Sequence, residues 1–208
     1  SLQARWHGNV RGPVDLFSHH PKTAESRIAK AEGVVEGTWS TQVQCHTALE
    51  PHGTVAHWEG ERLVLHLSTQ AAHRMAEDVA QHFDLPLRDV RVLCPYVGGG
   101  FGAKATIRKD TVAAVELARL SGAPVRVVLD RAEELTVGGN RPSVDMDLSL
   151  AADADGGLLG ITLDAWNSSG IAVGHAVGAF MRVMYPGPPK QLRDWDVVTH
   201  APPGAPFR

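Results

Sequence analysis

The amino-acid sequence predicts an α+β fold of two-layer antiparallel sheets with helices, built from duplicated β-β-α-β-like units. Residues 54–68 and 144–170 each read as a β-hairpin, because apolar side chains alternate on either side of a short turn. Helical patterns at 71–83 and 107–120 lie between these hairpins, and each is followed by a short strand. Antiparallel hairpins with interspersed helices are typical of α+β domains rather than of a doubly wound parallel sheet.

The helix predicted at 71–83 has the clearest pattern in the chain. Met75, Val79 and Phe83 recur every four residues and therefore share one face, while acidic and amide side chains lie on the other. The helix at 107–120 is apolar over most of its circumference, which predicts that it is well buried. Further elements are expected as a short helix at 23–33 and strands at 34–44, 89–95 and 123–130.

The remaining stretches are expected to be irregular. A polar loop containing two glycines follows residue 130, and the second hairpin turns at Asp155-Gly156-Gly157. Beyond Gly170, repeated prolines indicate a loop-rich segment. Residues 1–22 show little periodicity and are expected to form an irregular leader, which leaves 23–208 as one domain. Both ends of the chain resemble cuts in a longer polypeptide.

Composition excludes several classes of protein. The 208 residues carry a formal net charge of -3, so no basic surplus is present to neutralise nucleic-acid phosphates. The two cysteines, Cys45 and Cys94, are far apart, which argues against a disulfide framework or an iron–sulfur site within this chain. No apolar run reaches the ~18 residues of a membrane span, and no targeting segment is visible. We expect a cytoplasmic protein, and export as a folded complex stays open.

The segment PYVGGGFGAK (95–104) raises the main functional question. A phosphate-binding P-loop requires glycine directly before lysine and a hydroxyl residue after it, whereas Ala103 and Ala105 flank Lys104 here. A dinucleotide-binding turn fits Gly98, Gly100 and Ala103, but Asp130 lies farther downstream than the usual ~20 residues. The segment also fits a tight strand–helix corner, or a loop whose backbone N–H groups approach a ligand.

The loop is one of four landmarks that occur in a characteristic order. LEPH (49–52), STQ (68–70), VGGGFGAK (97–104) and PPGAPFR (202–208) together resemble the molybdenum hydroxylases, the xanthine dehydrogenase and aldehyde oxidase family. The resemblance is to the large molybdopterin-binding subunit and covers about residues 23–208. It implies that this chain is the first part of a molybdopterin-binding domain, truncated at both ends.

The resemblance implies a cofactor site around the glycine loop. Gln70 corresponds to the family glutamine that hydrogen-bonds an oxo ligand of molybdenum without coordinating the metal. Gly99, Gly100, Phe101 and Gly102 correspond to the loop that lies near the cofactor. No direct metal ligand is expected, and Glu50 and His52 are interpreted as residues that shape the cofactor lobe.

The substrate pocket implied by the resemblance includes Phe101, Ala105 and Arg208. Xanthine-acting members have a glutamate at the position of Ala105, so an aldehyde or another heterocycle is at least as plausible a substrate as a purine. The base glutamate of the family lies beyond Arg208, so no catalytic residue is expected within this chain, which should be inactive alone.

The implied cofactor is molybdopterin with molybdenum, including its cytosine dinucleotide form. Partner subunits or domains are expected to carry 2Fe-2S and FAD, and a second half of the molybdopterin subunit is expected to complete the site. A different class stays open: a non-catalytic pterin- or nucleotide-binding module that uses the glycine loop for binding alone.

Overall fold

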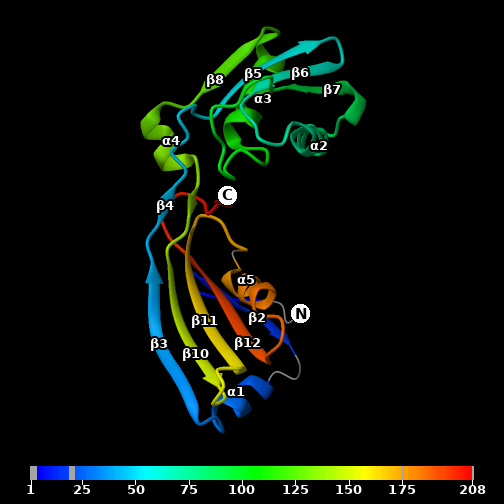
Figure 1. Ribbon diagram of the computed structural model, residues 1–208. Coiled ribbons are helices and arrows are strands. Elements are labelled where there is room, and N and C mark those ends of the chain that lie inside the picture. Colours follow the sequence, from blue (N-terminus) through cyan, green and yellow to red (C-terminus); the bar gives the residue numbers. More distant parts are fainter. Residues whose placement is uncertain (1–3, 19–21, 175, 208) are drawn as a thin grey trace. The chain divides into compact units, whose positions relative to one another are not determined.

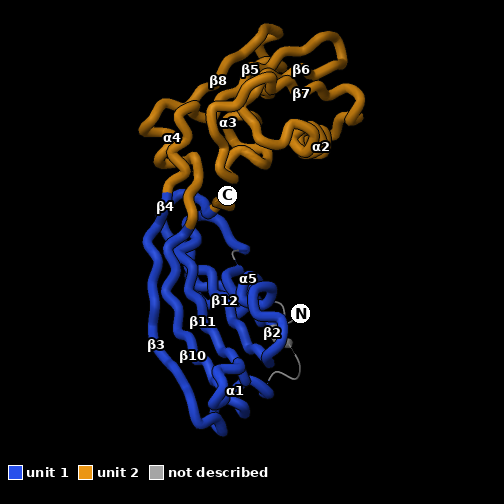
Figure 2. Tube along the Cα trace, in the orientation of Figure 1, with its two compact units in different colours: residues 1–44, 142–204 blue, residues 45–141, 205–208 orange. Residues whose placement is uncertain are grey.

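The computed structural model describes residues 4–18, 22–174 and 176–207 and divides the chain into two compact units (Figure 2). Unit 1 comprises residues 1–44 and 142–204, and unit 2 comprises residues 45–141 and 205–208. The span 23–208, which the sequence predicts as one domain, is divided between both units. Among the described residues, no helix is long and apolar enough to cross a membrane.

Unit 1 is built on a six-stranded sheet in the order β1-β2-β12-β11-β10-β3 (Figure 1). Its buried core centres on Ile161, Leu163 and Leu192, against which Met181 of the last helix packs. The elements are β1 (Arg5–His7), β2 (Val10–Ser18), α1 (Thr23–Ile28), β3 (Gly33–Thr41), β10 (Val144–Ala152), β11 (Leu158–Gly170), α5 (Val177–Met184) and β12 (Lys190–Val198).

Unit 2 contains a four-stranded sheet in the order β7-β6-β5-β8, with α2 packed on β7 and α3 packed on β5 and β8. Leu63, Leu65, Met75 and Val79 are nearly inaccessible in its core, as the sequence patterns predict. The elements are β5 (Gly53–Glu59), β6 (Arg62–Leu67), α2 (Ala72–Phe83), the 3-10 turn η1 (Leu87–Asp89), β7 (Val90–Leu93), α3 (Lys109–Ser121), β8 (Val125–Val128) and α4 (Arg131–Val137). Two short paired strands, β4 (Gln44–Cys45) and β9 (Asn140–Arg141), lie where the chain passes between the units, and Gln44 is the last residue of the first segment of unit 1.

The predicted duplication is visible in the topology of both sheets. In unit 1, the β10–β11 hairpin continues through α5 to β12, which pairs in parallel with β11. In unit 2, the β5–β6 hairpin continues through α2 to β7, which pairs in parallel with β6. The α+β prediction is confirmed. The two parallel pairs arise because a helical crossover returns the chain in its original direction.

Three stretches expected to be irregular form regular elements. The prediction of an irregular leader is wrong for the strands β1 and β2, which lie between residues 5 and 18. The strand β2 pairs with β12, a partner distant in sequence. The stretch after Gly170 contains α5 and β12, where buried Asp194 and Asp196 hide the usual apolar pattern of a strand. The loop after residue 130 contains α4, which begins with a capping box between Asp130 and Glu133.

Asp194 is a buried carboxyl group in the core of unit 1. It is 1% exposed and accepts hydrogen bonds from the backbone N–H groups of Val177 and Gly178 at the start of α5. Burial raises the pKa of Asp194 to about 6, and the nearby Asp196 adds to the rise although the N–H donors oppose it. Folding therefore shifts the titration of Asp194 toward the protonated form, although a carboxyl group with this pKa is still ionised at neutral pH.

We predict that Asp194→Asn changes how stability depends on pH. The unfolded carboxyl ionises first as pH rises, so wild type loses stability between about pH 4 and pH 6 and stays lower above it. Relative to the Asn variant this loss amounts to roughly 3 kcal/mol. Urea unfolding of both proteins at several pH values measures the difference. Parallel pH profiles for the two proteins would contradict the burial of this acid.

Candidate functional site

The glycine loop follows β7 in unit 2 and precedes α3. Gly99 and Gly102 have φ angles of 102° and 105°, which side chains rarely adopt. Phe101 is left-handed as well, with φ 49°, although this costs a non-glycine residue about 1–2 kcal/mol. The surrounding structure must therefore hold the loop in this shape.

The two ends of the loop are fixed by carboxylate and amide side chains. The Gly98 N–H donates to Glu50 Oε2 at 2.7 Å, and the Gly102 N–H donates to Gln70 Oε1 at 2.8 Å. A Cβ atom at Gly100 would lie 2.6 Å from Gln70 Oε1, so only glycine lets the loop approach this side chain so closely. Glu50 and Gln70 thus clamp the loop from both ends.

Three consecutive backbone donors remain in the middle of the loop. Within the described part of the chain, the N–H groups of Gly99, Gly100 and Phe101 have no protein acceptor. Gln70 uses its oxygen for Gly102, and its Nε2 amide has no protein acceptor in the same residues. Adjacent unpaired N–H groups form a concavity that suits electronegative or anionic ligand atoms.

Lys104 is a buried cation that holds the base of the loop. Its Nζ donates to the Glu50 carbonyl oxygen at 2.6 Å and to Ser68 Oγ at 2.7 Å, and its side chain is 0% exposed. The Lys104 carbonyl accepts in turn from the Gln70 N–H and from Thr69 Oγ1. The lysine, which is misplaced for a P-loop, therefore ties three strand-end segments together.

The Glu50 carboxylate completes this network. It accepts from Ser68 Oγ at 2.7 Å, from the Gly98 N–H, and from Lys104 Nζ at 3.4 Å. Desolvation by itself would raise the pKa of Glu50, but these three donors lower the pKa overall. Glu50 is therefore ionised at neutral pH and acts as an acceptor of hydrogen bonds within the protein.

His52 links the loop to α4. Its ring Nδ1 lies 2.8 Å from Glu134 Oε1, and its backbone N–H donates to Glu134 Oε2 at 2.9 Å. The ring Nε2 lies 3.2 Å from the carbonyl oxygen of Ala103, directly after the glycines. Burial would raise the pKa of Glu134, but the donors of His52 lower it overall. Nothing in the local sequence signals this pairing, although the capping box signals the helix that carries Glu134.

The segment 205–207 packs against the glycine loop within unit 2. The Pro206 carbonyl oxygen lies 2.6 Å from His46 Nε2, and the Phe207 ring stacks on His46 with centroids 4.8 Å apart. A Cβ atom at Gly102 would lie 2.2 Å from the Pro206 oxygen, so a side chain there would displace this segment. Gly102 therefore allows the close packing of the 205–207 segment on the loop. Its N–H group is already hydrogen-bonded to Gln70.

The structure brings most of the predicted site residues together. Gln70 and the loop residues from Gly99 to Gly102 form one constellation, and Phe101 at its tip is 49% exposed. Ala105 follows the loop directly and is partly exposed. Arg208 lies outside the described residues. The roles of His46, Ser68 and Glu134 were not predicted, because their contacts come from segments distant in the chain.

Comparison with known proteins identifies the class of this chain. The model of the molybdopterin cofactor-binding domain matches residues 11–208. The aldehyde oxidoreductase molybdenum-binding subunit PaoC of Escherichia coli O157:H7 is 34% identical over 157 residues, which is 76% of this chain and 21% of the relative. A xanthine dehydrogenase molybdenum-binding subunit of the same organism is 33% identical over 152 residues, 73% of this chain and 20% of the relative.

Solved structures agree with this match. The reconstituted CO dehydrogenase from Oligotropha carboxidovorans superposes with a TM-score of 0.85 and 26% identity, over 98% of this chain and 26% of that one. The chain therefore belongs to the molybdopterin cofactor-binding domain family of the molybdenum hydroxylases. It spans about a fifth of the length of the curated relatives it matches.

We predict that Lys104→Met destabilises unit 2 by about 2–5 kcal/mol, because it leaves the Glu50 carbonyl and the Ser68 hydroxyl without their donor. Lys109→Met is the matched control, since Lys109 is exposed on α3. Urea unfolding of both variants against wild type measures the change. A loss below about 1 kcal/mol for Lys104→Met would show that the ammonium group does not hold the loop.

Proposed function

We propose that this chain forms part of the molybdopterin-binding subunit of an oxidoreductase that hydroxylates an aldehyde or an N-heteroaromatic carbon with water. The observation that carries the proposal is the row of donors at Gly99, Gly100, Phe101 and Gln70 Nε2, left without protein acceptors in the described residues. Relatives named as aldehyde oxidoreductase and xanthine dehydrogenase subunits support this reaction class.

The residues present fit a molybdenum cofactor. The donor row offers N–H groups to electronegative oxygens, and it contains no thiolate or imidazole that would compete as a metal ligand. Gln70 is held at its oxygen by Gly102, which orients its amide nitrogen as a donor. We infer that Gln70 and the loop amides contact the oxygens of the cofactor without coordinating the metal.

When bound, the cofactor supplies the two-electron oxidation of a carbon centre, with the added oxygen taken from water. The chain contributes binding and orientation. Phe101 is half exposed at the tip of the loop and would cover the substrate and exclude water beside it. A small residue such as Ala105 would leave room in a substrate pocket, which favours an aldehyde or a non-purine heterocycle. Arg208 would stabilise negative charge that develops on the substrate.

The rest of the enzyme is proposed to lie outside these residues. A base glutamate would follow Arg208, and 2Fe-2S and FAD on partner subunits or domains would carry electrons away. The cofactor would be molybdopterin, either alone or extended to its cytosine dinucleotide. The proposed compartment is the cytoplasm. The 208-residue chain would supply part of the site and be inactive alone.

The test uses the full-length subunit that contains this chain, with Gln70→Ala as the variant. Losing a donor to the cofactor should lower dye-coupled oxidation of an aldehyde by roughly 10–100-fold. Gln81→Ala is the matched control, because Gln81 is exposed on α2, and it should keep full activity. Molybdenum content, measured by mass spectrometry, separates loss of cofactor from loss of turnover.

Three results would each overturn a part of the proposal. Full activity of Gln70→Ala with normal molybdenum would remove the glutamine from the site. Absence of molybdenum and of any oxidase activity in the wild-type full-length protein would reject the enzyme itself and favour a pterin- or nucleotide-binding module. Stoichiometric molybdenum on the isolated 208-residue chain would contradict the need for a second half.

A further inference from the structure

Two adjoining cavities lie in unit 1, beside α1 and the loop between α5 and β12. The first has a volume of about 510 Å³ and is lined by Lys22, Thr23, Ser26, Arg27, Lys30, Ala31 and Leu159. The second, about 500 Å³, is lined on its apolar side by Leu158, Met184, Tyr185 and the prolines at 186, 188 and 189. Arg27 and Leu159 line both, so the cavities share a wall.

The first cavity is lined by one face of α1 and its C-terminal turn. Thr23, Ser26, Arg27 and Lys30 recur at i, i+3, i+4 and i+7, so their side chains share that face, while Glu25 lies on another. The lining therefore holds three cations and two hydroxyl groups and contains no carboxylate. All of these donors are side-chain groups. The backbone N–H groups at the start of this short helix are not needed for the site.

Two of the three cations, Arg27 and Lys30, are available to a ligand. Arg27 and Lys30 are exposed, and neither forms an ion pair with a carboxylate within the described ranges. Gly160 on β11 lets α1 approach the sheet closely, since a Cβ atom there would lie 3.1 Å from the Ala24 oxygen and 3.3 Å from Arg27 Cβ. The strand thereby holds the base of the Arg27 side chain at the shared wall.

Hydrogen bonds hold the proline loop that lines the second cavity. Lys190 is 1% exposed, and its Nζ donates to the Pro188 carbonyl oxygen at 2.7 Å. The Pro189 carbonyl accepts from the Ile161 N–H on β11 at 3.0 Å. The proline loop is thus tied to the sheet from two sides, and it presents Tyr185 and its prolines as an apolar surface.

We propose that the two cavities form one binding site for an organic phosphate monoester with an apolar or aromatic ester group. A phosphate dianion has three terminal oxygens, which match a set of ammonium, guanidinium and hydroxyl donors. Arg27 at the shared wall contacts the phosphate, and the ester group lies against Tyr185 and the proline loop. The site consists of unit 1 residues only and does not involve the glycine loop of unit 2.

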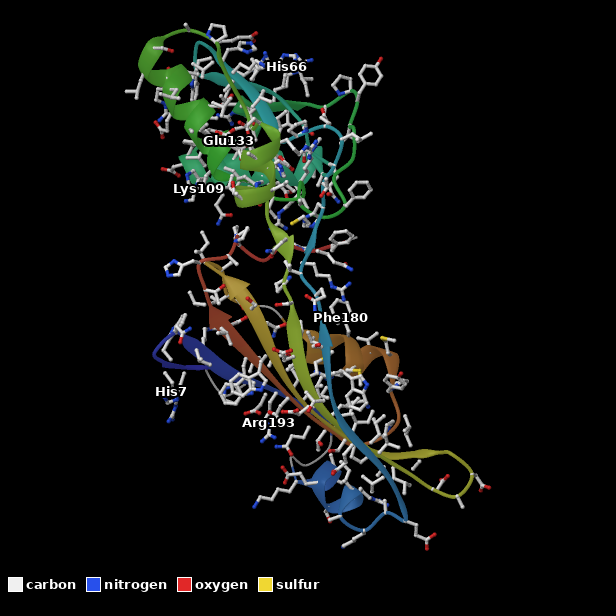
Figure 3. All side chains as sticks on the ribbon, turned by 90° about the vertical axis from the view of Figure 1, so that its left-hand side faces the viewer. His7, His66, Lys109, Glu133, Phe180 and Arg193 are labelled. Carbon is white, nitrogen blue, oxygen red and sulfur yellow. The ribbon has the colours of Figure 1, made fainter. Side chains whose placement is uncertain are left out.

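Phenyl phosphate is the ligand for the test, titrated into the full 208-residue chain by calorimetry. We expect saturable binding that the double variant Arg27→Gln, Lys30→Gln weakens by roughly tenfold or more. Lys109→Gln removes a positive charge from α3 in unit 2 (Figure 3) and should leave the affinity unchanged. Far-UV circular dichroism confirms that each variant is folded.

The two halves of the site are tested separately. Tyr185→Ala should weaken phenyl phosphate and leave inorganic phosphate unaffected, because the latter has no ester group. Phenol, which lacks the phosphate, should not bind. Equal binding of phenol and phenyl phosphate, equal affinity of the double variant and wild type, or no binding of phenyl phosphate at millimolar concentration would each overturn the proposal.

A final comparison distinguishes soluble ligands from lipid headgroups, which share this chemistry. Phosphatidylcholine vesicles with and without phosphatidic acid are sedimented with the wild-type chain and the double variant. Binding that requires phosphatidic acid and the two cations assigns the site to a lipid headgroup. Phenyl phosphate binding without vesicle binding assigns it to a small soluble monoester.

Discussion

The glycine loop depends on one buried charge. The Lys104 ammonium lies at the base of the loop and donates to the Glu50 backbone oxygen and to the Ser68 hydroxyl, which belong to segments that flank the β5–β6 hairpin. A buried cation without such partners is very costly, so the three segments must stay together. The glutamate that accepts from Gly98 and the glutamine that accepts from Gly102 are then held at either end of the loop.

This arrangement separates the loop amides into two groups. The N–H groups of Gly98 and Gly102, at the two ends of the loop, donate hydrogen bonds to side chains of the protein. The three N–H groups between them are left for a ligand. The positive φ angles of Gly99 and Gly102, with Phe101 between them, turn the backbone so that this division is possible. Preorganised backbone donors suit the oxygens of a cofactor, because no further ordering is needed when the ligand binds.

The sequence predicted the elements whose patterns are local. The β5–β6 hairpin and α2 follow from alternating leucines and from the Met75–Val79–Phe83 spacing, and the family motifs placed Gln70 beside the loop. The sequence did not predict strand β12, because two of its inward positions are Asp194 and Asp196. Asp194 accepts from backbone amides of α5, and Asp196 pairs with Arg11. Contacts such as that of His52 with Glu134 join residues far apart in the chain, so local sequence patterns cannot predict them.

The division of the loop amides is the central claim, and amide-proton temperature coefficients measured by NMR on the labelled chain test it most directly. Gly98 and Gly102 should show the small coefficients of hydrogen-bonded amides, while Gly99, Gly100 and Phe101 should show the larger coefficients of amides without an acceptor. Small coefficients at all five residues would mean that the protein itself uses every donor of the loop, which contradicts a ligand site there.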